Sequence, residues 1–359
     1  MISKAEKRVI GQRLLSAFRA AGAVEIAPDI LLPAGTLLDL YGEDIRARAY
    51  VTSDPIRGEV MLRPDFTVPV VRAHMDGGAE PARYCYLGEV FRKQDHGDAR
   101  PEQLRDNEYL QAGFELFSRD PGADAEIFAL FYRILAPYDL RPVMGDMGLL
   151  TAAVAALPLS QARRRALAHH LWRPRRLSRL LSRYSRPAPA REFAETDAPW
   201  TGMRSGAEME ARIASLRAEP DEPPLPAEWS DRLARLFSVD APAPEALEML
   251  DALAAEINAI APPLARLRAR IEAIAVQGID PGAVRLSASH GQREMEYYDG
   301  MTFSFRAESR PDWPPIASGG RYDAMTRMLG QGREIPAVGG IIRPGLLAEL
   351  AQTAEGARC

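Results

Sequence analysis

The chain has 359 residues, of which 47% are hydrophobic and 26% charged, and its formal net charge is −4 at pH 7. This length and composition predict a globular protein of two or three structural units, and the charge balance excludes a general attraction to nucleic acid. Two cysteines, Cys85 and Cys359, and five histidines without metal-ligand spacing give no sign of a disulfide framework, a metal site or a cofactor. No apolar run approaches the roughly 20 residues of a membrane span, and the polar start has no apolar signal segment. We therefore expect a cytoplasmic protein without membrane contact.

The N-terminal segment predicts a helix. Ser3 and Glu6 have the spacing of a capping box, apolar residues follow at helical intervals, and Gly22 is a typical stop. The apolar positions are Val9, Ile10, Leu14, Leu15 and Phe18. Residues 23–45, with a short strand signal, two prolines and an acidic turn, are interpreted as the rim of a sheet.

A strand-to-helix junction is predicted next. Residues 59–63 have strand character, Pro64 ends the strand, and a helix begins near Thr67 with Pro69 in its first turn. Asp65 and Thr67 thus place a carboxylate and a hydroxyl where an ammonium group would be received. A helix N-cap role for either residue is an alternative of similar weight.

Two further strands are predicted at residues 82–92 and 108–117. In the second, Gln111, Gly113 and Glu115 share one face, whereas Leu110, Ala112, Phe114 and Leu116 share the other. The polar face fits a sheet with a wet cleft on one side, although solvent exposure alone would also permit it.

A mainly helical insert is expected to divide the sheet. A helix is predicted at 121–136, mostly helical sequence with a break near Pro174 at 147–186, and further helices at 229–238 and 243–276. Strands return at 283–289 and 301–308. We therefore divide the chain into residues 1–140 and 281–359, which form the core, and residues 141–280, which form the insert.

Arginines are concentrated in the insert. Residues 163–186 contain nine arginines and no acidic residue. Such a run would suit RNA or an acidic partner. Leucines alternate with the arginines, however, and this favours an amphipathic helical region with a solvated face.

The last third of the chain carries the residue types of an amino-acid pocket. A planar guanidinium, Arg293, suits a ligand carboxylate, while Tyr297, Tyr298 and Tyr322 would supply ring walls with hydroxyl tips. Gly319 and Gly320, in a predicted turn, would allow close backbone approach. Taken alone, this set is more often structural than functional.

Five segments together resemble the class II aminoacyl-tRNA synthetase core, and specifically histidyl-tRNA synthetase. They are LRPDFT at 62–67, GEVFR at 88–92, QAGFE at 111–115, REMEYY at 293–298 and GGRYD at 319–323. The resemblance extends to about residue 348. It implies an α+β fold, an antiparallel sheet flanked by helices, and a homodimer whose first-motif proline would be Pro28 or Pro33.

The resemblance also implies a histidine pocket. Asp65, Thr67 and Gln111 match the residues that hold the α-ammonium group, and Arg293 matches the carboxylate clamp. Glu115, Tyr298 and Tyr322 match residues around the imidazole, and Tyr297 is a further wall residue. A carboxylate beside an imidazole and acceptors beside an ammonium group are chemically consistent with this assignment.

Departures from the synthetase pattern favour a non-catalytic protein. Gln94, Asn107 and Ile342 stand where the ATP site has a glutamate, a basic and an acidic residue, which leaves Arg92 and Arg343 for phosphate contact. Because only 16 residues follow Arg343, no anticodon-binding domain is expected. This combination resembles the family of ATP phosphoribosyltransferase regulatory subunits. That family implies assembly with the short-form catalytic subunit, activation of it, and histidine inhibition of the first step of histidine biosynthesis.

Two alternatives remain open at this stage. The first is a truncated histidyl-tRNA synthetase-like enzyme that activates histidine with ATP; Arg92 and Arg343 favour it, and Gln94, Asn107 and Ile342 oppose it. The second is an RNA-sensing pseudo-synthetase that uses the arginine-rich insert, although tRNA is not the expected partner. In the favoured interpretation the chain has no catalytic residues and L-histidine is its effector.

Overall fold

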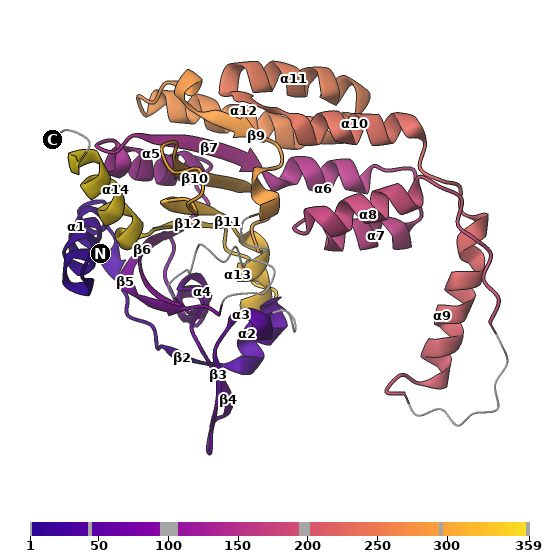
Figure 1. The fold of residues 1–359 in the computed structure, drawn as a ribbon, viewed down its shortest axis with the longest axis horizontal. Helices are drawn as coiled ribbons and strands as arrows, with labels where there is room; N and C mark the ends of the chain where they lie inside the picture. The colour runs from indigo at the N-terminus through magenta and orange to yellow at the C-terminus, as the bar shows by residue number, and fades with distance from the viewer. Residues whose placement is uncertain (1, 42–44, 94–106, 194–201, 294–296, 357–359) are drawn as a thin grey trace.

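The computed structural model describes residues 2–41, 45–93, 107–193, 202–293 and 297–356, and it is built on a nine-stranded sheet (Figure 1). Pairing is antiparallel except for β1 with β5 and β7 with β9, which are parallel. In spatial order the strands are β1 (Val24–Glu25), β5 (Ala82–Phe91), β6 (Glu108–Phe117), β12 (Ala337–Ile342), β11 (Ala317–Arg321), β10 (Met301–Ala307), β7 (Leu140–Asp146), β9 (Arg285–Ser287) and β8 (Asp240–Pro242). A mainly antiparallel sheet flanked by helices was the fold predicted from the sequence, and it is confirmed.

One face of the sheet is covered by α1 (Lys4–Ala20), α5 (Ala123–Leu135) and α14 (Pro344–Gly356). Aromatic rings fill this layer; the Phe18 ring, for example, lies 5.6 Å from that of Phe114. The predicted capping box of Ser3 and Glu6 is present at the start of α1. Val9, predicted on the apolar face of this helix, is instead 53% exposed, because the buried stripe passes through Leu14, Leu15 and Phe18.

The opposite face is covered by α4 (Thr67–Met75) and α13 (Asp323–Leu329). Beside them lie α2 (Ala34–Tyr41), α3 (Ile45–Arg48) and a separate three-stranded sheet of β2 (Leu31–Pro33), β4 (Gly58–Leu62) and β3 (Val51–Asp54). Residues 23–45 are therefore only partly a rim of the main sheet, since β1 alone joins it. The predicted junction between a strand and the helix that begins at Thr67 is confirmed.

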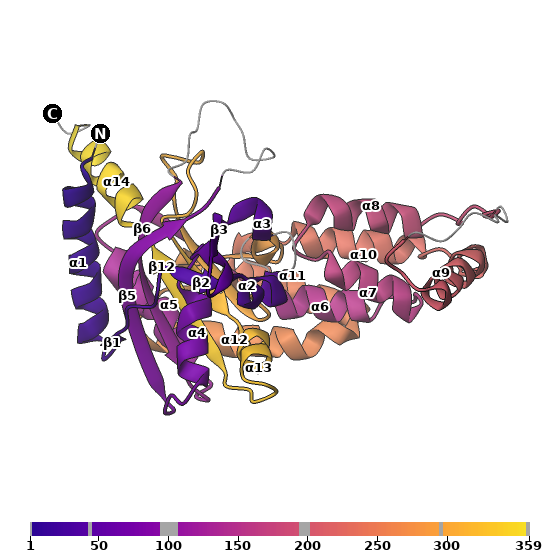
Figure 2. The same ribbon diagram turned by 90° about the horizontal axis from the view of Figure 1, so that it is seen from below.

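The insert is a group of helices at the end of the molecule opposite α1, with α9 projecting from it (Figures 1 and 2). The expected helix at 243–276 is interrupted by the turn η3 (Asn258–Ile260), because Pro262 and Pro263 cannot donate backbone hydrogen bonds and begin a new helix. The helices are α6 (Met147–Ala155), α7 (Gln161–His169), α8 (Pro174–Tyr184), α9 (Gly206–Ala218), α10 (Ala227–Ser238), α11 (Ala243–Glu256) and α12 (Ala261–Val276). The division at 140/141 and 280/281 stays a prediction; β7 spans the first of these positions.

Gly319 and Gly320 lie within β11, so the predicted glycine turn is wrong. Their lack of side chains serves close packing instead. A Cβ on Gly319 would lie 2.3 Å from the carbonyl oxygen of Gly339, and one on Gly320 would lie 2.7 Å from the Tyr298 ring. Both contacts are too short for a Cβ, so these glycines permit the sheet and the tyrosine to approach each other.

None of the helices in the described part of the chain is long and apolar enough to cross a membrane.

Candidate amino-acid binding site

Glu115 is the centre of a buried hydrogen-bonded cluster on the α4 and α13 side of the sheet. Its carboxylate accepts hydrogen bonds from the Tyr322 hydroxyl at 2.6 Å and from Tyr86 and Thr67 at 2.9 Å each. The side chain is only 1% exposed. The cluster joins β6, β5 and the junctions next to α4 and α13, so only the folded sheet assembles it.

The environment of Glu115 shifts its acidity. Burial raises the pKa of Glu115 to about 7, and the hydrogen bonds from Tyr322, Tyr86 and Thr67 only partly oppose this effect. Burial and the nearby Glu115 charge also raise the pKa of Tyr86 and of Tyr322, so both hydroxyls remain donors. Near neutral pH, therefore, Glu115 changes readily between a charged acceptor and a neutral acid.

Three tyrosines, Tyr297, Tyr298 and Tyr322, lie beside this cluster. The Tyr297 hydroxyl donates to Thr67 Oγ1 at 3.5 Å, and its ring centre lies 4.8 Å from that of Tyr298 and 6.1 Å from that of Tyr322. Tyr298 is buried against Gly320. The structure thus brings together Thr67, Glu115 and the three tyrosines that the sequence predicted.

Gln111 lies on the same face of β6 as Glu115, four residues away, so the predicted alternation of this strand is confirmed. Its side chain is 2% exposed, and its Oε1 has no hydrogen-bond partner among the described residues. A buried acceptor without a donor costs roughly 1–3 kcal/mol. A ligand N–H group at this position would remove that cost.

Asp65 and Thr67 flank the start of α4. Asp65 Oδ1 accepts a hydrogen bond from the Val68 backbone N–H at 3.2 Å. The N-cap residue of α4 is Phe66, however, so neither Asp65 nor Thr67 occupies the N-cap position weighed as the alternative. Thr67 instead turns toward Glu115. The Arg92 guanidinium donates from Nε to the Pro64 carbonyl oxygen at 2.8 Å and so supports this junction.

Arg293 ends the short helix η5 (His290–Arg293), and its side chain lies outside the described residues, as does Gln94. The preceding residue, Gln292, is buried and donates from Nε2 to the Leu171 carbonyl oxygen at 3.1 Å. Leu171 lies between α7 and α8. The segment that carries the predicted clamp is therefore bonded directly to the insert.

The residues predicted to contact phosphate have structural partners. Arg343 Nη1 donates to the Pro315 carbonyl oxygen, as Arg92 does to that of Pro64. Ile342 is fully buried among the aliphatic residues on the opposite side of the sheet. These contacts bring no further side chain into position to bind ATP.

Tyr86 is a site residue that sequence reasoning missed. It lies opposite Gly113 in the β5–β6 register, where a Cβ on Gly113 would be 2.2 Å from its ring, and it stacks on Phe66 with ring centres 4.3 Å apart. Strand alternation offered a signal, because Tyr86 shares one face of β5 with Gly88, and this face lies on the same side of the sheet as Gly113 and Glu115. The register that places Tyr86 beside Glu115 could not be read from the sequence.

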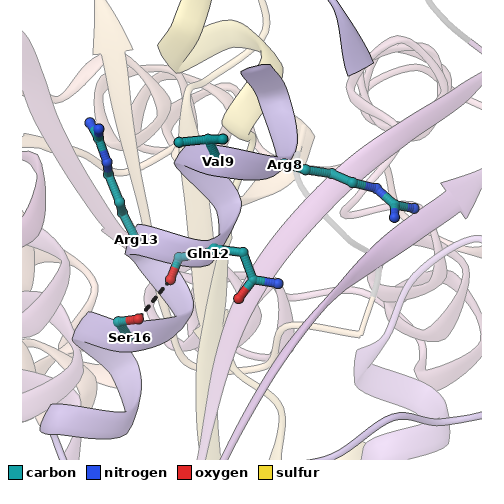
Figure 3. A pocket seen from close by; sticks show the side chains of 5 residues that line it. All are labelled: Arg8, Val9, Gln12, Arg13 and Ser16. Atoms are coloured by element: carbon teal, nitrogen blue, oxygen red, sulfur yellow. Dashed lines mark hydrogen bonds between the residues drawn. The ribbon is translucent and has the colours of Figure 1, made fainter. Parts of the chain in front are cut away.

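A surface hollow lies elsewhere, on the outer side of α1 (Figure 3). Arg8, Val9, Gln12, Arg13 and Ser16 line it, and all five come from one helix. One helix surface does not enclose a small molecule, so we place the candidate site at Glu115. Among the described residues, no group of three or more His, Cys, Asp or Glu side chains is arranged to hold a metal ion.

Comparison with known proteins identifies the family. The sequence model of the family described as histidyl-tRNA synthetase matches residues 3–201 and 204–344. Two similar proteins are named ATP phosphoribosyltransferase regulatory subunit. The one from Mesorhizobium japonicum is 32% identical and the alignment covers 90% of this chain and 92% of the relative. The one from Brucella anthropi is 33% identical, with 89% and 91% covered.

The chain belongs to the histidyl-tRNA synthetase family, in its group of ATP phosphoribosyltransferase regulatory subunits. The names of the relatives designate the regulatory and not the catalytic subunit, so the resemblance found in the sequence is confirmed.

Solved structures show the same fold. The crystal structure of an ATP phosphoribosyltransferase regulatory subunit/histidyl-tRNA synthetase from Bacillus halodurans has a TM-score of 0.70 at 21% identity, covering 96% of this chain and 79% of that one. A histidyl-tRNA synthetase from Nostoc sp. PCC 7120 has a TM-score of 0.67 at 14% identity, covering 98% and 73%. At these identities the likeness concerns the fold alone.

Proposed function

We propose that this chain activates the short-form catalytic subunit of ATP phosphoribosyltransferase and mediates its inhibition by histidine, without catalysing a reaction itself. Relatives named as regulatory subunits of that enzyme support the first part. The observation that carries the second part is the Glu115 carboxylate, buried under three hydroxyl groups on the same strand face as the Gln111 oxygen that has no partner in the described structure. This role implies a cytoplasmic location.

Histidine fits the chemistry of the site. Its imidazole N–H would donate to Glu115, its ammonium group would donate to the oxygens of Gln111 and Asp65, and its carboxylate would pair with Arg293. The pKa of Glu115, about 7, lies close to that of free imidazole, about 6.5. One proton is therefore easily shared between the two groups.

Regulation follows from linkage. If histidine binds more tightly to one conformation of the complex with the catalytic subunit, it shifts the population toward that conformation. The bond from Gln292 to Leu171 gives a direct connection between the segment of Arg293 and the insert. With Arg293 as the carboxylate clamp, the proposed site reaches the insert through this one contact.

We also propose a homodimer formed through the outer side of α1 and the edge strand β1. Val9 and Val24 are 53% and 66% exposed there, and among the described strands β1 pairs with β5 alone, so no described strand occupies its other edge. Both elements lie at the end of the molecule away from the insert (Figure 2). Two apolar side chains beside a free strand edge suit association with a second copy.

The decisive experiment measures ATP phosphoribosyltransferase activity of the short-form catalytic subunit from the same source, with and without this chain, across a histidine titration. We expect activity on mixing and its loss as histidine rises. If no activity and no complex appear, the proposal is wrong. Histidine-dependent exchange of pyrophosphate into ATP would then support the truncated-synthetase alternative.

A variant tests the ligand assignment. Arg293→Ala should weaken histidine binding strongly, because the ligand carboxylate loses its charged partner. Unchanged histidine affinity in calorimetry would remove the clamp assignment but leave the activating role untouched.

A further inference from the structure

The structure separates eight of the nine arginines of residues 163–186 into two groups; the ninth, Arg173, is half-buried at the N-cap of α8. The first group supports the fold. Arg163 is 5% exposed and donates to the carbonyl oxygens of Pro223 and Glu219, while Arg164 donates to those of Leu157 and Leu159. Arg183 forms an ion pair with Glu219. These contacts account for part of the basic run as packing.

The second group lies on the surface. Arg165, Arg175, Arg176, Arg179 and Arg186 are exposed, and none has an acidic partner within the described ranges. We call these five residues the arginine face. Arg179 makes one further contact, from Nε to the Arg175 carbonyl oxygen at 3.3 Å. The arginine face is therefore a set of like charges that the described fold leaves uncompensated.

The arrangement on α8 is unfavourable for the helix itself. Arg175 and Arg176 lie in its first turn, where cations oppose the helix dipole, and no acidic residue lies there. Arg175 and Arg179 are four residues apart, a spacing at which like charges repel. The opposite side of α8 is apolar and packed, with Leu177 and Tyr184 buried. Packing of α8 against the rest of the protein explains its apolar side. It does not explain the arginines on the exposed side.

We propose that the arginine face is a docking surface for an acidic surface of the ATP phosphoribosyltransferase catalytic subunit; this inference rests on the proposed function. Arginine forms paired hydrogen bonds with carboxylates, and the segment contains no lysine. The surface lies at the opposite end of the molecule from α1, so a homodimer through α1 leaves it accessible (Figures 1 and 2).

The burial of the tyrosine and tryptophan side chains favours an acidic protein over single-stranded nucleic acid. Nucleic-acid surfaces of this kind combine basic groups with exposed aromatic rings for base stacking. In α7 and α8 the aromatic residue Tyr184 is buried, with the Arg163 guanidinium 5.1 Å from its ring centre, and Trp172 between the helices is half-buried. The arginine face thus offers charge without a stacking platform.

The arginine face is also connected to the candidate site. Leu171, whose carbonyl oxygen receives the Gln292 hydrogen bond, lies in the turn that joins α7 to α8. A change at the Arg293 segment therefore reaches the docking surface through one buried contact.

The test is the affinity of the purified short-form catalytic subunit for variants of this chain, measured by titration calorimetry at low and at moderate ionic strength. The double variant R175E/R179E should bind at least about tenfold more weakly at low ionic strength, because two attractive contacts become repulsive. The difference in affinity between R175E/R179E and the unaltered chain should shrink as salt is added.

The control R57E/R212E makes the same charge change at two exposed arginines, one in the β3–β4 turn and one on α9, and should bind as the unaltered chain does. Neutral R175Q/R179Q should be intermediate, and thermal melts should show that all variants are folded.

Each outcome decides the matter. If R175E/R179E binds and activates the catalytic subunit as well as the unaltered chain, the docking surface is wrong while the proposed function stands. If the unaltered chain neither binds nor activates, the proposed function fails and the docking surface with it. If bulk tRNA binds the unaltered chain but not R175E/R179E, and the subunit affinity is the same for both, the arginine face binds nucleic acid instead.

Discussion

Glu115 lies in the core of the sheet, where a carboxyl group is tolerated only because its oxygens accept three hydrogen bonds. Burial still raises the pKa of Glu115 to about 7. In the unfolded chain a glutamate has a pKa of about 4.3. Between these two values the folded protein binds more protons than the unfolded chain, so Glu115 makes the free energy of unfolding fall as pH rises.

Glu115→Gln should remove this pH dependence. A shift from about 4.3 to about 7 corresponds to roughly 3–4 kcal/mol at pH 8. The free energy of unfolding of the variant, relative to the unaltered chain, should therefore rise by about that amount between pH 4.5 and pH 8. Denaturant unfolding across this range without histidine checks the prediction. Exposed Glu272→Gln is the control, and parallel curves for E115Q and the unaltered chain would contradict the assignment.

A substitution at Gln111 can separate an effect on histidine binding from an effect on the stability of the fold. Because its Oε1 has no partner among the described residues, Gln111→Met removes no internal hydrogen bond to that atom and should leave the melting temperature unchanged or raise it, since a buried acceptor without a donor is lost. Histidine should bind about tenfold to a hundredfold more weakly, since a hydrogen bond to a charged group contributes roughly 1.5–3 kcal/mol. Calorimetry checks this, with exposed Gln352→Met as the same chemical change at a remote position. Full histidine affinity in Q111M would exclude Gln111 from the site.

At the scale of elements, the insert and the core are joined by buried polar contacts. Arg270 of α12 pairs with Asp124 of α5 at 2.7 Å and with Asp146 at 2.8 Å, and Asp124 also pairs with Arg321 of β11 at 2.6 Å. Arg321 precedes Tyr322, whose hydroxyl binds Glu115. The hydrogen bond from Gln292 to the Leu171 carbonyl oxygen is a second buried polar contact between the core and the insert. The insert is therefore linked to β11 through Asp124 and to η5 through Gln292, and both of these elements adjoin residues of the proposed site.

Gln292→Met tests this coupling. The variant keeps the side-chain length but cannot donate to Leu171, so histidine should still bind while its inhibition of the assembled enzyme becomes weaker. The check is a histidine titration of activity together with calorimetry of histidine binding, with Q352M again as control. Unchanged inhibition would show that the signal does not pass through this bond.

For the whole molecule, α1 and the insert occupy opposite ends (Figure 2), which leaves separate surfaces for a second copy and for another subunit. The charged residues are also unevenly distributed along the chain. The chain as a whole has a net charge of −4, whereas residues 163–186 contain nine arginines and no acidic residue. The surface proposed for self-association and the surface proposed for docking therefore lie at different places and differ in chemistry.

The variant V9E/V24E should be monomeric at concentrations at which the unaltered chain is a dimer, because burying two carboxylates opposes association. Sedimentation velocity measures the assembly state. Val276, 88% exposed at the end of α12, supplies the control V276E, which should remain dimeric. A dimeric V9E/V24E would place the interface elsewhere.

The sequence by itself determined the features that depend on neighbours along the chain. Helix α1 with its capping box, the alternation of Gln111 and Glu115 on β6, and the junction before Thr67 are encoded by residues a few positions apart. The motifs also indicated the family and most of the residues around Glu115.

Tertiary structure decided what depends on register and packing. Local sequence does not show the contact of Tyr86 with Glu115 or the unpartnered Gln111 oxygen in the described structure. Nor does it show which arginines bond within the fold and which are exposed without an acidic partner in the described ranges. The two adjacent glycines of β11 predicted a turn, but they lie in a strand, where their lack of a side chain permits the close approach of the Tyr298 ring and the Gly339 backbone. Periodicity reports which face a side chain occupies, and only the pairing of distant segments fixes what that side chain meets.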